Sequence, residues 1–89
     1  MIGYLILNKE DRMKKISLVQ MKENSKGKVV EISGGSNLVS RLMNMSVFKG
    51  KEVTKLSHVG LRGPVVIKVG RSILALGHGV AAKIIVEVE

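Results

Sequence analysis

The chain has 89 residues and a formal net charge of +8, from 15 Lys and Arg against seven Asp and Glu. This length suits one small domain. The absence of cysteine excludes disulfide scaffolds, Cys-based zinc sites, iron–sulfur clusters and thiol catalysis. Hydrophobic residues make up 45% of the chain, aromatic residues only 2%, and ten residues are glycine. We therefore expect an aliphatic core in a compact, β-rich domain with many turns.

Residues 1–15 form an N-terminal extension in which an apolar run, Ile2 to Leu7, precedes a charged stretch. The apolar run is too short to cross a bilayer. It also lacks the basic residues before it and the small-residue cleavage site after it that mark a secretory signal. The pattern predicts a cytoplasmic protein whose extension is either an added edge strand or loosely ordered.

Two short strands are predicted next, over residues 16–21 and 28–32, with a polar turn between them. In the second strand, the side-chain period of two places Val30 and Ile32 on one face and Val29 on the other.

A single short helix is predicted over residues 36–45, where Ser36 or Asn37 can cap the first turn. Its apolar face recurs at positions i, i+4 and i+7 and consists of Leu38, Leu42 and Met45. Arg41 falls on the more polar side. Because the helix is only about ten residues long, it must be stabilised by packing on the strands.

Three further strands and a closing strand follow, over residues 51–59, 65–69, 72–76 and 83–89. The spacing of apolar residues in the first of these indicates a bulge. Gly70-Arg71 predicts a tight hairpin with glycine at its first central position. With about five short strands before the closing one and one short helix, the chain is expected to be all-β, and a sheet this small avoids open edges by curling into a barrel.

The sequence contains no arrangement typical of an active site. The glutamates lie in turns or on outward strand faces, and no serine stands in a G-x-S-x-G context. The glycine-rich fragments at 70–72 and 77–79 lack the rest of a phosphate-binding loop. We predict no catalytic residues, no cofactor-binding residues and no enzymatic activity.

Metal and nucleic-acid sites are also unsupported by composition. His58 and His78 are the only histidines and lie on separate predicted elements, so we predict no metal site, although the two can meet in space. His78 is expected to face solvent in a short corner before the last strand, formed by a single helical turn. One Tyr and one Phe leave little to stack on bases, so no nucleic-acid partner is expected.

Three stretches together resemble the FeoA family of bacterial ferrous-iron uptake. They are KGKVVEISGG, RLMNMSVFKGKEV and GPVVIKVGRSILALGHGVAAKIIVE, and the resemblance covers residues 16–89 as one domain. Two positions depart from the family pattern: Ser46 replaces the glycine that ends the helix, and Lys49 replaces a proline before Gly50. A left-handed backbone at Ser46 would cost on the order of 1 kcal/mol relative to glycine.

The resemblance implies an SH3-like β-barrel that acts as an accessory protein beside FeoB, a membrane ferrous-iron transporter with a cytoplasmic GTPase domain. Fe(II) is then the transported ion, and no bound cofactor is predicted. Related barrels occur in DtxR-type regulators, so the alternative is a regulatory domain that binds a divalent transition metal through His58, His78 and glutamates.

The segment around the end of the helix is the expected partner-binding surface, and the residues assigned to it are Arg41, Met45, Phe48 and Lys49. The N-terminal apolar stretch could also supply an edge strand for a homo-oligomer.

Overall fold

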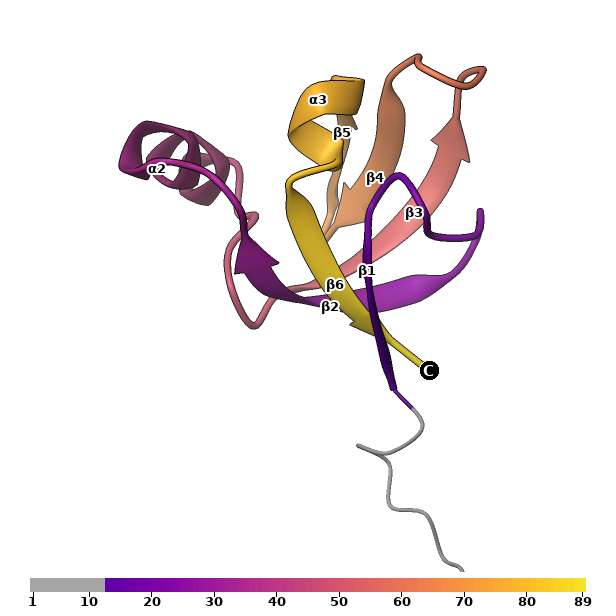
Figure 1. The fold of residues 1–89 in the computed structure, drawn as a ribbon, viewed down its shortest axis with the longest axis horizontal. Coiled ribbons are helices and arrows are strands. Elements are labelled where there is room, and N and C mark those ends of the chain that lie inside the picture. Colours follow the sequence, from indigo (N-terminus) through magenta and orange to yellow (C-terminus); the bar gives the residue numbers. More distant parts are fainter. Residues whose placement is uncertain (1–12) are drawn as a thin grey trace, which may run out of the picture.

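A computed structural model describes residues 13–89, which fold into six strands, one short helix and a single helical turn (Figure 1). The strands are β1 (Lys14–Ser17), β2 (Lys26–Ile32), β3 (Glu52–His58), β4 (Val65–Val69), β5 (Ser72–Leu76) and β6 (Ile84–Val88). The helices are α2 (Ser36–Asn44) and α3 (His78–Ala81). The all-β class with one short helix is confirmed. Most of the predicted 1–15 extension lies outside the described residues.

All six strands join one antiparallel sheet in the order β1-β6-β2-β3-β4-β5. The sheet curls strongly, and α2 lies to one side of it, while α3 lies in the connection from β5 to β6 (Figure 1). The curled sheet encloses an aliphatic core. Its buried hydrophobic members are Leu18, Met21, Val29, Leu42, Val47, Val53, Val65, Ile67, Val69, Leu76, Ala81, Ile84 and Val86.

A bulge in β2 changes which of its side chains face the core. The register to β6 shifts between Val29 and Glu31, so that Val29 pairs with Val86 while Ile32 pairs with Ile84. Both partners in β6 are fully buried. Val29 and Ile32 therefore share the inner side, and the prediction that they lie on opposite faces is wrong, because the extra residue resets the alternation.

The predicted bulge in the third strand is confirmed, because the pairing of β3 with β4 shifts between Lys55 and Ser57. The predicted hairpin is also confirmed: Val69 pairs with Ser72, and Gly70 has a φ of 59°. A positive φ at the first central residue alone is typical of a type II′ turn, in which glycine is favoured.

The first strand is shorter than predicted and begins earlier, at Lys14 rather than residue 16. After Ser17 the chain turns, since the Gln20 side chain accepts a hydrogen bond from the Ser17 N–H at 2.9 Å. Leu18 and Met21 then enter the core from this turn rather than from a strand. The prediction failed because a turn can bury apolar residues without the alternation of a strand.

Helix α2 begins after Gly35, which takes the N-cap position in an extended conformation without a side-chain hydrogen bond. The predicted caps, Ser36 and Asn37, lie inside the first turn instead. The predicted apolar face is confirmed, since Leu42 is fully buried and both Leu38 and Met45 pack against the core. In the described part of the chain, none of the helices has the length and apolar character needed to cross a membrane.

Candidate partner-binding groove

An apolar groove of about 310 Å³ lies between the end of β2, helix α2 and the segment that follows α2. We call it the α2 groove. It is lined by Val30, Glu31, Ile32, Val39, Met43, Phe48 and Lys49. Five of these seven side chains are hydrophobic, so the groove is suited to an apolar segment of another molecule.

Helix α2 supplies one wall because it carries two apolar stripes. Leu38 and Leu42 face the core, whereas Val39 and Met43, one position further along, line the groove. Met43 leaves 55% of its surface exposed. A methionine in this setting is adaptable, because its unbranched side chain adjusts to the shape of a partner.

The opposite wall depends on how α2 ends. The Ser46 N–H donates to the Met43 carbonyl and the Val47 N–H donates to the Leu42 carbonyl, at 2.9 and 2.8 Å. Ser46 has a φ of 67°. This is a Schellman motif, which reverses the chain and buries Val47 against Leu42.

Phe48 follows the buried Val47 and points outward, with 37% of its surface exposed. Two backbone hydrogen bonds fix this segment beside β2: the Gly50 N–H donates to the Val29 carbonyl, and the Val29 N–H donates to the Lys51 carbonyl. The Lys51 Nζ lies 5.9 Å from the centre of the Phe48 ring, within range of a cation–π interaction.

The structure thus brings two of the four predicted partner-binding residues, Phe48 and Lys49, into one groove. Arg41 is exposed on α2 outside the groove, and Met45 is half-buried against the core. The sequence reasoning missed Val39 and Met43. Their i, i+4 spacing beside the core stripe is a signal that could have identified them.

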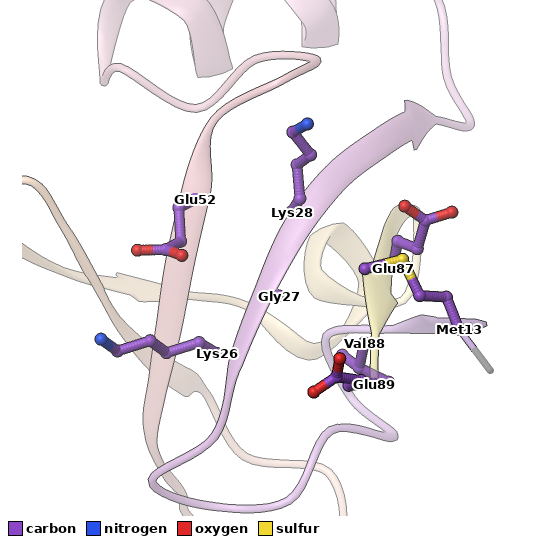
Figure 2. A pocket seen from close by; sticks show the side chains of 8 residues that line it. All are labelled: Met13, Lys26, Gly27, Lys28, Glu52, Glu87, Val88 and Glu89. Atoms are coloured by element: carbon purple, nitrogen blue, oxygen red, sulfur yellow. The ribbon is translucent and has the colours of Figure 1, made fainter. Parts of the chain in front are cut away.

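A second hollow lies across the sheet and is lined by charged side chains (Figure 2). Lys28 of β2 lies between Glu52 of β3 and Glu87 of β6, with which it is directly paired in register. Lys26 and Glu89 also line this hollow. Because the charges alternate, this face does not offer the uniformly positive surface that a nucleic acid or another polyanion requires.

The two histidines, which the sequence places twenty positions apart, lie in contact. Their ring centres are 5.9 Å apart with an angle of 30° between the ring planes. His78 is half-buried at the start of α3 and packs against His58. The prediction of a single helical turn at this corner is confirmed.

Comparison with known proteins connects this architecture with iron uptake. The chain is similar to a crystal structure of an iron uptake regulatory protein, FeoA, with 32% identity and a TM-score of 0.75, covering 84% of this chain and 99% of that one. It also resembles a zinc complex of FeoA from Stenotrophomonas maltophilia, described as an SH3 domain protein, with 21% identity and a TM-score of 0.68, covering 80% and 88%.

A manganese-dependent transcriptional repressor shares the fold, with 14% identity and a TM-score of 0.77, over 92% of this chain and 48% of the repressor. No curated protein matches the chain. The model of the FeoA domain matches residues 16–88. The fold is therefore an SH3-like domain, and the chain belongs to the FeoA family of ferrous-iron transport.

Proposed function

We propose that this protein is a cytoplasmic accessory protein of ferrous-iron uptake that binds the GTPase-containing part of a FeoB-type transporter and modulates transport. Fe(II) is in this view the cargo of the transporter rather than a resident cofactor. The α2 groove is the observation that supports binding, because an exposed apolar groove framed by a rigid sheet is typical of a docking surface.

The charges around the groove indicate what kind of segment it accepts. Lys49 lines the groove and the Lys51 Nζ lies over the Phe48 ring, while Glu31 is the one acidic side chain in the lining. The chain as a whole carries a net charge of +8. An apolar segment flanked by acidic residues is therefore the favoured partner, and the positive charge also suits a position beside anionic lipids.

The test is a titration of the purified cytoplasmic part of the transporter with the full chain. Phe48→Ala combined with Met43→Ala removes both large exposed apolar side chains of the groove. We expect this variant to bind at least about tenfold more weakly, because central aromatic residues carry much of the energy of an interface. Lys49→Glu is expected to weaken binding mainly at low salt, through a slower association rate.

Leu61→Ala and Ile73→Ala provide matched controls, because both side chains are well exposed, at 91% and 65%, and lie outside the α2 groove. Neither control should change the affinity. Unchanged binding by the Phe48/Met43 variant would show that the interface lies on another surface. No binding by the unaltered chain would refute the proposal that the transporter is the partner.

A further inference from the structure

Strand β5 is an open edge of the sheet, and we propose that it pairs with the β5 strand of a second copy of the chain. The sheet has two edge strands, β1 and β5, because its order is β1-β6-β2-β3-β4-β5. An edge strand carries a row of backbone N–H and C=O groups that another extended strand can bind. The two edges differ in how this row is protected.

The free edge of β1 is blocked within the chain. The Leu18 N–H donates to a carbonyl of β6. Because backbone groups alternate in direction along an antiparallel strand, Lys15 and Ser17 direct theirs away from β6. The Ser17 N–H donates to Gln20 Oε1 at 2.9 Å, and the Ser17 carbonyl accepts from the Gln20 N–H at 3.0 Å. Lys14 and Lys15 are both exposed, and such charges on an edge oppose pairing with a second copy.

The free edge of β5 has neither form of protection. The tight hairpin makes Val69 and Ser72 a hydrogen-bonded pair, so every second residue from Ser72 onward directs its backbone groups to β4. Those of Ile73 and Ala75 are directed outward, and among residues 13–89 no group forms a hydrogen bond with them. The strand SILAL contains no charged residue, and Ile73 leaves 65% of its surface exposed. An uncharged, apolar edge of this kind is suited to pairing.

The outward groups of β5 are complementary to those of a second copy. A two-fold axis at Leu74 places Ile73 of each copy opposite Ala75 of the other in an antiparallel pair. Both pairs exchange two N–H···O bonds, which satisfies every outward backbone group of the two strands. A large side chain then lies opposite a small one on the outer face. On the inner face the two Leu74 side chains meet, and Leu74 already packs against the core of its own copy.

The charge of the chain opposes this pairing only in part. Each copy carries a net charge of +8, but β5 itself is uncharged. Lys68 of β4 pairs with Ile73, so the two Lys68 residues of a dimer lie three strand spacings apart, roughly 14 Å. This separation exceeds the Debye length of about 8 Å at physiological ionic strength. Added salt should therefore strengthen the dimer, whereas it would weaken the binding of an acidic strand from another protein.

The expected dimer is weak. Stable interfaces bury roughly 1,200–2,000 Å² in total, and two strands of five residues provide only part of such an area. We therefore expect a dissociation constant on the order of 0.1–1 mM. This inference does not depend on the proposed transporter docking, because no residue of β5 lines the α2 groove.

The experiment is sedimentation equilibrium and amide hydrogen exchange of the untagged full chain between about 20 μM and 2 mM, which spans the expected dissociation constant. The average mass should rise toward that of a dimer with protein concentration and with added NaCl. Exchange of the Ile73 and Ala75 amides should slow over the same range of concentration. The Lys15 amide on the β1 edge is the internal control, and its exchange should not change.

Ile73→Lys places a charge on the β5 edge and should weaken the dimer at least about tenfold. Leu61→Lys is the matched control, because it adds the same charge to a side chain that is 91% exposed and lies outside β5. It should leave the dissociation constant within about twofold. Ala75→Pro is a second variant, which removes one outward N–H and no hydrogen bond to β4.

Three results would overturn the proposal. The first is a chain that stays monomeric at about 2 mM in high salt, which is the result expected if another protein donates the strand. The second is a dimer that Ile73→Lys and Leu61→Lys affect equally. The third is a dimer in which the Ile73 and Ala75 amides exchange as fast as in the monomer. The amides of the unaltered chain decide even if a variant does not fold.

Discussion

Lys55 is the most deeply buried charged side chain of the described residues, with 2% of its surface exposed. Its Nζ donates to the carbonyls of Val19 and Met21 at 2.9 and 2.8 Å. The Lys55 backbone also forms hydrogen bonds with the same turn: its carbonyl accepts from the Asn24 N–H, and its N–H donates to the Ser25 carbonyl. The lysine therefore ties the turn between β1 and β2 to β3, and a hydrophobic side chain could not satisfy these carbonyls.

This burial predicts a rise of stability in alkaline solution. Desolvation lowers the pKa of Lys55 below its ordinary value of 10.5, and the charge of Glu23 opposes this only in part. As the pH rises through the lowered pKa, the folded chain releases this proton before the unfolded chain does. The unfolded state then binds more protons, so the free energy of unfolding contributed by Lys55 increases up to about pH 10.5.

Urea unfolding between pH 8 and 10.5 measures this effect as the difference in the free energy of unfolding between the unaltered chain and Lys55→Met. The difference should grow in favour of the unaltered chain as the pH increases. In Glu23→Gln the lysine pKa falls further, so the rise should begin at lower pH. A difference that stays constant with pH would show that Lys55 keeps an ordinary pKa in the fold, and a difference that shrinks would show that its pKa is raised; either result would contradict the prediction.

The α2 groove also depends on individual residues, and the sequence identified only some of them. Phe48 was identified from the sequence because it is the lone phenylalanine of the chain and lies beside Lys49 and Gly50 in a turn. Val39 and Met43 were missed because the sequence reasoning followed only the apolar face that meets the core, which contains Leu38 and Leu42, and not the second apolar stripe beside it.

At the scale of elements, the end of α2 is the feature on which the groove depends. The Schellman motif requires a left-handed backbone at Ser46, which has a φ of 67°. The family pattern has glycine at this position, which adopts such a backbone without a steric cost. Serine adopts it at a steric cost that glycine does not have. The strain is local, since the hydrogen bonds to Leu42 and Met43 are both made.

Ser46→Gly is therefore expected to raise the free energy of unfolding by about 0.5–1 kcal/mol, because relief of strain exceeds the added freedom of the unfolded chain. Chemical denaturation of the two chains measures the change. Gly50→Ala is a control expected to change stability in the opposite direction, because Gly50 has a φ of 97°. Nothing lies within 4 Å of an added Cβ at this position, so a loss of stability would come from the backbone conformation and not from a clash. If Ser46→Gly instead lowers the free energy of unfolding, Ser46 is not strained in the fold.

At the scale of the whole molecule, we propose that the predicted domain of residues 16–89, extended by the start of β1 at Lys14, forms one folding unit. The buried side chains of the described chain all lie at Ser17 or beyond, and β1 begins at Lys14. Strand β1 completes one edge by pairing with β6 from Lys14 to Ser17, and the Leu18 N–H extends this contact to the Ile84 carbonyl.

A chain shortened to residues 13–89 should therefore keep the fold, with a free energy of unfolding within about 1 kcal/mol of the full chain. A chain of residues 19–89 loses β1 and the fully buried Leu18, and it should lose at least about 2–5 kcal/mol. Circular dichroism and urea unfolding of both chains test the boundary. Equal losses in the two shortened chains would place essential contacts before residue 13.

The sequence by itself determined the class of fold, the places of most strands, the short helix and the family. These follow from local patterns, such as the two-residue period of strands, the spacing of apolar residues in a helix and the glycine turn at Gly70. The family resemblance also drew attention to Ser46, because the family pattern has glycine at the position that ends the helix.

Only the tertiary structure decided which side chains share a surface. The bulge in β2 returned Val29 and Ile32 to one face, the curl of the sheet brought His58 to His78, and packing buried Lys55. Each outcome depends on contacts between residues far apart in the chain. A one-residue change of register reverses every side chain that follows, and no local pattern records where that change occurs.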